Sequence, residues 1–195
     1  MEKSKPYLRI ASEEAFCPPE MFDIFREILG SDWLDDPGFR SQWGYFIDSQ
    51  SERAVFVRDA LCSLGDDRIA NMDAAGIDKA IIGLTSPGVQ VMQTQQATEF
   101  AAYANDVLVD GIRKHPDRYY GLTAIAAQDP EQAAREIERG HELGLKGVII
   151  NSHTLNEHMD QEKFWPIFEV AEALDTPIYM HPATPTKDMV GPLIE

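Results

Sequence analysis

Short apolar runs alternate along the chain with longer segments in which apolar residues recur every three or four positions. The apolar runs occupy residues 8–11, 79–85, 120–126, 147–151 and 177–181. Nearly continuous apolar runs of this length are typical of parallel strands that are covered on both faces. The segments between them predict amphipathic helices. Two of the apolar helix faces consist of Phe100, Ala104, Val107, Leu108 and Ile112, and of Phe164, Ile167, Phe168, Ala171 and Leu174.

Glycine and proline positions support the same division. Gly76 and Gly144 each stand where a predicted helix has to end before the next apolar run. Pro166 fits the helix around it only if it lies in the first turn. Alternating units of strand and helix imply parallel strands joined by right-handed crossovers. Residues 17–55 interrupt this alternation, and we interpret them as an insertion after the first strand of a single domain that spans residues 1–195.

Composition limits the classes of partner. The formal net charge of −16 argues against nucleic acid or an anionic membrane surface, because both repel an acidic protein. It permits an anionic substrate that is held by a local cation. No run of about 18 apolar residues predicts a membrane span, and the first residues do not form a signal peptide. Cys17 and Cys62 are too few for a disulfide framework, so a reduced, cytoplasmic setting is expected.

The predicted strands carry possible metal ligands rather than phosphate-binding motifs. No glycine-rich turn follows the first strand and no P-loop is present, which argues against a nucleotide-binding sheet. Glu13 follows the first apolar run, and a side chain that points into a barrel there would lie at the rim that holds barrel active sites. The alternative is a solvated loop residue.

Four further polar positions are candidates with open alternatives. His181 ends the last apolar run and suits metal binding or proton transfer, or is a core histidine bonded to a backbone carbonyl. Thr85 ends the second run and either lines the site or caps the turn. His153, which with Asn151 is expected to end the fourth strand on one shared face, is a candidate substrate contact or supports one from behind, or is an ordinary loop histidine. Arg53 opens a helical segment, where most arginines are surface residues.

Several segments together resemble a known family. They are RIASEEAF (residues 9–16), RIANMDAAGIDKA (68–80), HPDRYYGLTAIAAQDPEQAAREIERG (115–140), LGLKGVIINSHT and YMHPAT. These motifs resemble the amidohydrolase-related (amidohydrolase 2) decarboxylases, most of all those of the 5-carboxyvanillate decarboxylase type. The resemblance implies an α/β fold, a (β/α)8 TIM barrel of the metal-dependent hydrolase type, of which this chain would hold about five strands. We therefore expect it to be the first part of a longer enzyme.

The resemblance also implies roles for particular residues. Glu13 and His181 match metal-binding positions, and Arg53 matches an arginine that contacts the substrate carboxylate. Ala15 stands where many relatives have a second strand-one ligand, which makes Mn²⁺ at least as plausible as Zn²⁺. The catalytic acid is expected beyond residue 195. An open barrel wall would leave strand edges unpaired, so association with copies of the same chain is expected.

The implied function is metal-dependent, non-oxidative decarboxylation of a hydroxylated aromatic carboxylic acid, with a small aromatic carboxylate as substrate. Two alternatives stay open at this point. One is a metal-dependent hydrolase of a lactone or amide on the same fold, because fold alone does not determine the reaction. The other is that the chain by itself is an inactive fragment of such an enzyme.

Overall fold

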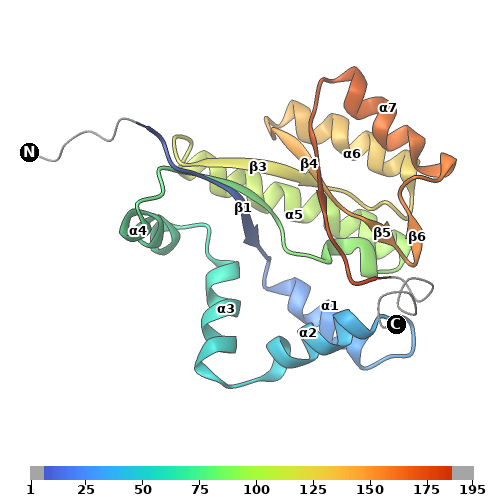
Figure 1. The fold of residues 1–195 in the computed structure, drawn as a ribbon, viewed down its shortest axis with the longest axis horizontal. Coiled ribbons are helices and arrows are strands. Elements are labelled where there is room, and N and C mark those ends of the chain that lie inside the picture. The colour runs from blue at the N-terminus through green and yellow to red at the C-terminus, as the bar shows by residue number, and fades with distance from the viewer. Residues whose placement is uncertain (1–6, 186–195) are drawn as a thin grey trace, which may run out of the picture.

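A five-stranded parallel sheet forms the centre of the computed structural model, which describes residues 7–185. Its strands follow one another in space in the order β1-β2-β3-β4-β7, and every neighbouring pair is parallel (Figure 1). The strands are β1 (Ile10–Phe16), β2 (Lys79–Leu84), β3 (Tyr119–Ala124), β4 (Gly147–Asn151) and β7 (Ile178–His181). Sequential parallel strands with helical crossovers form the wall of a (β/α) barrel. The predicted α/β barrel class is confirmed, with five of its strands present.

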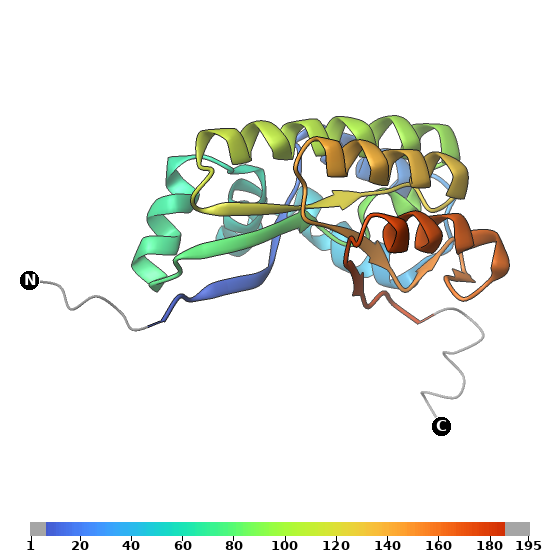
Figure 2. The same ribbon diagram turned by 90° about the horizontal axis from the view of Figure 1, so that it is seen from above.

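The crossover helices lie along one face of this sheet. Figure 2 shows two of them, α5 and α6, side by side over the strands. These helices are α4 (Asp66–Ala75), α5 (Thr94–Lys114), α6 (Pro130–Glu142) and α7 (Trp165–Ala173). Gly76 and Gly144 end α4 and α6 with φ of 70° and 93°, a left-handed conformation that favours glycine. Pro166 lies in the first turn of α7, as predicted. None of the helices within residues 7–185 is long and apolar enough to cross a membrane.

Residues 17–55 fold into helices at the carboxyl end of the sheet, below it in Figure 1. They form α1 (Glu20–Leu29), α2 (Pro37–Asp48) and the start of α3 (Glu52–Cys62). The Phe25 ring packs edge-on against Phe39 and Trp43, with centroid distances of 5.1 and 4.9 Å. Trp43 Nε1 donates to Ser86 O at 3.3 Å, which fastens α2 to the loop after β2.

Two expected boundaries were wrong. The first strand was expected at residues 8–11, but β1 extends to Phe16, so Glu13 lies within the strand rather than after it. His153 was expected to end the fourth strand. It instead begins a two-strand hairpin, β5 (His153–Thr154) and β6 (Glu157–His158). The turn between them, Leu155-Asn156, has positive φ at both residues, which is the geometry of a tight two-residue hairpin loop.

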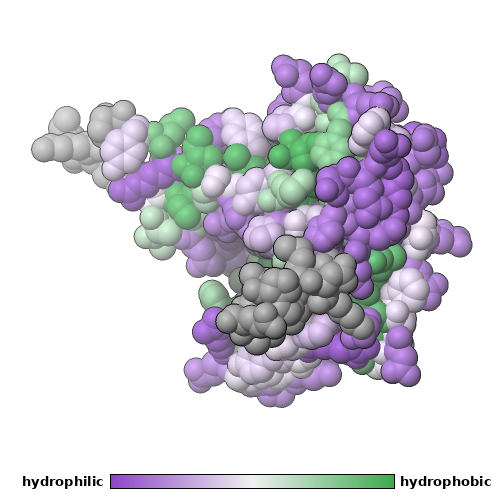
Figure 3. All heavy atoms as spheres, turned by 45° about the vertical axis from the view of Figure 1, so that its right-hand side comes forward, coloured by the Kyte–Doolittle hydropathy of each residue, from purple (hydrophilic) through white to green (hydrophobic). Residues whose placement is uncertain are grey.

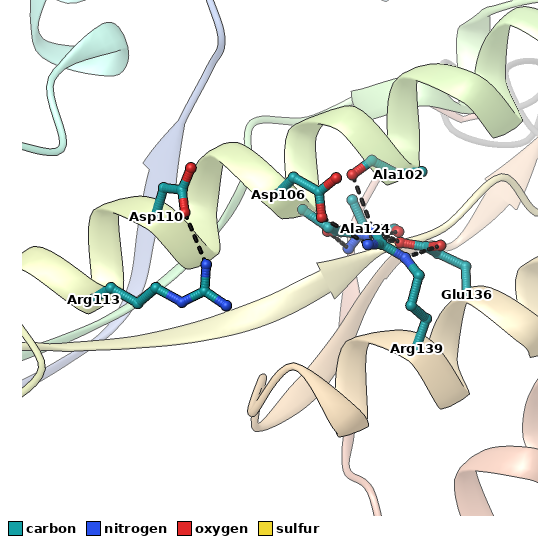
Figure 4. Close-up of polar contacts among 8 residues, drawn as sticks. Ala102, Asp106, Asp110, Arg113, Ala124, Glu136 and Arg139 are labelled. Atoms are coloured by element: carbon teal, nitrogen blue, oxygen red, sulfur yellow. Dashed lines mark hydrogen bonds and ion pairs between the residues drawn. The ribbon is translucent and has the colours of Figure 1, made fainter.

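Polar contacts fasten α5 and α6 to each other and to β3. Arg139 of α6 contacts Asp106 Oδ1 at 2.6 Å and donates to Ala102 O at 3.0 Å, both on α5 (Figure 4). Asn105 of α5 is fully buried and exchanges two hydrogen bonds with the backbone of Ala124, at 2.8 and 2.9 Å. Buried polar groups that are fully paired in this way rigidify their surroundings. The carboxyl end of β3 is therefore held firmly by the helix layer.

The opposite face of the sheet carries an apolar groove of about 430 Å³, lined by residues that include Ile81, Tyr120, Leu122, Ile178 and Tyr179. Figure 3 shows hydrophobic residues along the sheet on the side of the N-terminus of the chain, whereas the surface over the C-terminal helices is mostly hydrophilic. The face of the sheet away from the helices is thus the inner face of the barrel wall. The groove adjoins the pocket at the carboxyl end of the strands, with which it shares Ile81, Leu122 and Tyr179.

Candidate metal and substrate site

Glu13 and His181 come together although they lie on the two edge strands of the sheet, β1 and β7. Glu13 Oε1 is 3.0 Å from His181 Nε2, and the two side chains are 50% and 24% exposed. Both line a pocket of about 220 Å³ at the carboxyl end of the strands, the end at which barrel enzymes hold their active sites. The curvature of the sheet brings its two edges to one point.

The environment of His181 suits a metal-binding imidazole. Its Nδ1 lies 2.7 Å from Pro182 O, and a carbonyl only accepts, so Nδ1 carries the hydrogen of this bond. Nε2 is the nitrogen that faces Glu13. Metal-binding histidines commonly donate the other ring N–H to a backbone carbonyl, which fixes the tautomer. A carboxylate oxygen and an imidazole nitrogen together fit Mn²⁺ or Zn²⁺.

The ligand set within the described residues is small. Between residues 7 and 185 there is no group of three or more His, Cys, Asp or Glu side chains placed to hold one ion. Glu13 and His181 alone supply fewer ligands than a tight site requires. They fit a divalent ion in chemistry and geometry, as part of a ligand set.

Tyr179 is a third member of this group that the sequence analysis missed. It precedes His181 by two positions on β7, and its hydroxyl donates to Glu13 Oε2. This hydrogen bond raises the pKa of Tyr179 above its usual value, with burial and the Glu13 charge as smaller causes. Residues two apart on a strand share a face, so the available signal was the alternation around His181.

Glu14 points away from this pair, as strand alternation predicts. Its Oε2 lies 3.7 Å from Arg68 Nη1. Arg68 also donates to the backbone carbonyls of Ala15, Ser63 and Ala60, at 2.7, 2.7 and 3.0 Å. Burial lowers the pKa of the Arg68 guanidinium, and the charge of Glu14 opposes this shift. Arg68 therefore fixes the end of β1 on the side opposite Glu13.

The loop after β2 forms another wall of the pocket. Thr85 lines the pocket and donates its backbone N–H to Phe16 O at 2.9 Å. Ser86 and Pro87 follow it in the wall, and both bind Asn151: Ser86 Oγ donates to Asn151 Oδ1 and Asn151 Nδ2 donates to Pro87 O, each at 2.8 Å. Gln90 Oε1 accepts from the Asn151 backbone N–H at 2.6 Å and from Nδ2 at 2.9 Å. A buried amide network thus holds this wall.

Two predicted site residues lie outside the pocket. Arg53 is exposed on α3 and forms no hydrogen bond or ion pair with the residues that the structure describes. His153 Nε2 binds Thr184 O at 2.6 Å, and its ring lies 6.0 Å from that of His158. Its buried Nδ1 has no partner within the described part of the chain. Of the five predicted site residues, the structure brings Glu13, Thr85 and His181 together, and it does not bring Arg53 or His153 to them.

The pocket also takes residues from α2 and the turn before it. Asp36, Phe39 and Gln42 line it. Asp36 accepts from Phe39 N at 2.9 Å and caps the N-terminus of α2. These residues belong to the segment interpreted as an insertion, and no local sequence signal connects them to strands far along the chain.

Comparison with known proteins identifies relatives of one type. γ-Resorcylate decarboxylase of Polaromonas sp. is 38% identical over 137 residues, which cover 66% of this chain and 42% of that protein. The γ-resorcylate decarboxylase of Rhodococcus jostii is 31% identical over 188 residues, 91% of this chain and 51% of that protein. The chain therefore spans about half the length of the curated relatives that it matches.

Solved structures agree with these matches. The crystal structure of 5-carboxyvanillate decarboxylase from Novosphingobium aromaticivorans, complexed with manganese and 4-hydroxy-3-methoxy-5-nitrobenzoic acid, has a TM-score of 0.92 and 47% identity. The match covers 98% of this chain and 55% of that chain. The dihydroxybenzoic acid decarboxylase of Polaromonas sp., with bound manganese and the inhibitor 2-nitroresorcinol, has a TM-score of 0.72 and 30% identity, over 96% of this chain and 53% of that chain.

A family model described as Amidohydrolase matches residues 43–193, well over half of the sequence. These relatives are metal-dependent decarboxylases of hydroxylated aromatic acids, and their structures hold manganese. The resemblance inferred from the motifs is confirmed. The chain belongs to the amidohydrolase family.

Proposed function

We propose that this chain carries part of the active site of a non-oxidative decarboxylase that acts on a hydroxylated aromatic carboxylic acid with a divalent ion, Mn²⁺ or Zn²⁺. The observation that carries the proposal is the approach of Glu13 Oε1 to His181 Nε2, 3.0 Å, in a pocket at the carboxyl end of the sheet. Support comes from relatives that are decarboxylases of such acids and hold manganese with aromatic ligands.

Each residue has a proposed task. Glu13 and His181 would hold the ion, which when bound supplies positive charge that orients the substrate and stabilises developing negative charge. Thr85 lines the pocket and would contact the substrate, and His153 is proposed as a more distant contact. Arg53 would hold the substrate carboxylate by charge-assisted hydrogen bonds after its exposed side chain turns towards the pocket.

The reaction needs one proton transfer and no redox cofactor. A proton adds to the ring carbon that bears the carboxylate, the bond between that carbon and the carboxyl group breaks, and carbon dioxide leaves as the ring regains aromaticity. We propose that the acid that supplies the proton lies beyond residue 195. The substrate is proposed to be a small aromatic carboxylate. The cytoplasmic setting, the association with further copies and the lack of nucleic-acid or membrane partners stay predictions.

Carbon dioxide release from 5-carboxyvanillate and a dihydroxybenzoate, with Mn²⁺ added, tests this function. In the full-length enzyme, Glu13→Gln and His181→Ala should each lower turnover more than about 100-fold, because loss of a ligand should cost at least as much as loss of a partner that only orients one. Glu27→Gln, on the exposed side of α1, is the matched control and should behave as the wild type. Full turnover in either site variant would contradict the assignment. Ring-opening of a lactone without carbon dioxide release would instead indicate a hydrolase.

A further inference from the structure

We propose that Tyr179 is a positioning residue that holds the Glu13 carboxylate in the orientation needed to bind the ion. This inference rests on the proposed function, since it concerns the same metal site. Tyr179 and His181 both reach Glu13 from β7, and they contact different oxygens. The Tyr179 hydroxyl donates to Oε2, whereas His181 Nε2 faces Oε1. The hydrogen bond from Tyr179 fixes the rotation of the carboxylate about its last side-chain bond and leaves Oε1 facing His181 Nε2.

Packing does not supply this orientation. The Glu13 side chain is 50% exposed, so about half of its surface has no protein neighbour to restrict it. A half-exposed glutamate populates several rotamers unless hydrogen bonds select one. Among the described residues, Tyr179 is the donor to Oε2. Without its hydroxyl, that oxygen loses its partner and the carboxylate turns freely towards solvent.

The neighbouring cation does not replace Tyr179. Arg68, which is mostly buried beside β1, contacts Glu14 and three backbone carbonyls on the other side of the strand. Strand alternation directs Glu13 and Glu14 to opposite faces, so Arg68 is not available to Glu13. The hydrogen bond from Tyr179 therefore has no substitute within the described part of the site.

Loss of this hydrogen bond should weaken metal binding directly. Groups that hydrogen-bond to metal ligands orient them, and removal of such a group typically lowers metal affinity by about 10–100-fold. Here the affected ligand is one of two in the described site. The expected consequence of Tyr179→Phe is thus weaker binding of Mn²⁺ with the fold unchanged, because only one hydroxyl is removed from a partly exposed ring.

Tyr120 offers a matched control. It lies on β3 and lines the same apolar groove as Tyr179, but its hydroxyl accepts from Lys79 Nζ at 3.0 Å and not from any group at Glu13. Tyr120→Phe removes the same atom from the same inner face of the sheet. A purely structural effect of losing a hydroxyl from this face should appear in both variants, whereas loss of carboxylate positioning should appear only in Tyr179→Phe.

The first experiment is a titration of the purified protein with Mn²⁺ alone, with free ion followed by electron paramagnetic resonance. Tyr179→Phe should bind Mn²⁺ about 10–100-fold more weakly than the wild type, and Tyr120→Phe should stay within about twofold. Equal affinity of Tyr179→Phe and the wild type would overturn the inference. Equal weakening in both variants would also overturn it, because the effect would then be a general one of the sheet face.

A second experiment separates this inference from the proposed function. A double-mutant cycle of Tyr179→Phe and Glu13→Ala, measured by urea unfolding in metal-free buffer, reports whether the two side chains interact. We expect the double variant to lose less stability than the sum of the single variants. If the two side chains are coupled but the wild type binds no Mn²⁺, the contact between Tyr179 and Glu13 exists, and both the proposed metal site and the positioning role are wrong. If the wild type binds Mn²⁺ but the stability losses of the two single variants simply add in the double variant, only the positioning role is wrong.

Discussion

Replacement of Gln90 by methionine tests how firmly the pocket wall is held. Gln90 is 4% exposed and lies in the 3-10 turn η1 (Gly88–Val91), between β2 and α5. Its amide oxygen accepts from the backbone N–H and from the side-chain Nδ2 of Asn151, and its amide nitrogen donates to His153 O at 3.1 Å. Methionine has nearly the same length and shape but forms none of these bonds, so the change removes hydrogen bonds with little change in volume.

The expected loss follows from the groups left without partners. Asn151 is 6% exposed, and two of its N–H hydrogens, that of the backbone and one of the two on Nδ2, lose their acceptor, while the other Nδ2 hydrogen keeps Pro87 O. Each such group costs about 1–3 kcal/mol, so the free energy of unfolding should fall by about 2–6 kcal/mol. His153 O is only partly buried, and water can replace its lost donor. A domain of this size is stable by about 5–15 kcal/mol, so the variant should be folded but clearly weakened.

Urea denaturation followed by circular dichroism measures this loss as a lower midpoint at unchanged slope. Gln95→Met is the matched control, because Gln95 is exposed on α5 and its side chain donates to Glu99 Oε1 at 3.0 Å, on the same exposed helix. The control should change stability by no more than about 0.5 kcal/mol. A loss below about 1 kcal/mol for Gln90→Met would refute the reasoning, since it would mean that water or a rearranged Asn151 satisfies the freed groups.

Two further perturbations test the surroundings of β1. Arg68→Met leaves the carbonyls of Ala15 and Ser63 without their donor, so the free energy of unfolding in urea should fall by about 2–4 kcal/mol. The control Arg113→Met removes an exposed arginine and should cost about 0.5 kcal/mol or less. Similar losses in both variants would contradict the role of Arg68 in fixing the end of β1. Burial, with smaller contributions from Cys62 and Glu20, raises the pKa of the Cys17 thiol, so the folded state binds that proton more tightly than the unfolded state. The contribution of the Cys17 thiol to folding stability is complete below the unfolded thiol pKa of about 8.5 and is lost as pH rises above it. The urea midpoint of Cys17→Ala should therefore fall less steeply than that of the wild type between about pH 8 and 10. An equally steep fall in both proteins would be evidence against burial as the cause of the raised pKa.

The strands were predictable where both faces are covered. Residues 79–84 and 147–151 form β2 and β4, whose side chains are mostly buried, and their sequences are almost continuously apolar. β1 differs because one side of it borders the open pocket. Its burial is low over Ser12 and Glu13, so its sequence is polar in the middle and only its start has the pattern of a strand. The error in its boundary therefore arose at the functional site itself.

The sequence could predict only those site residues whose place on a strand indicates their role. His181 ends β7, and the sequence placed Glu13 at the carboxyl end of its strand, although it lies in the middle of β1; barrel geometry directs residues at those ends to one rim. Gln90 and Asn151 were not identified as partners, because they lie 61 positions apart and a buried amide has no local pattern. The β5–β6 hairpin was missed for a related reason. Its turn, Leu155-Asn156, has the required positive φ but not the Asn-Gly pair that usually indicates such a turn.

The position of His181 depends on residues that never contact it. In the pairing of β4 with β7, Asn151 stands opposite His181, and Ser152 N donates to His181 O at 3.0 Å. Asn151 is in turn held by Gln90 and by the loop that carries Ser86. The same amide network therefore fixes both the wall of the pocket and the last residue of the strand next to β7. Since Glu13 lies on the opposite edge of the sheet, the contact of 3.0 Å between Glu13 and His181 requires the curvature of all five strands to be kept. A change at Gln90 should consequently weaken Mn²⁺ binding as well as stability, although Gln90 has no contact with either ligand.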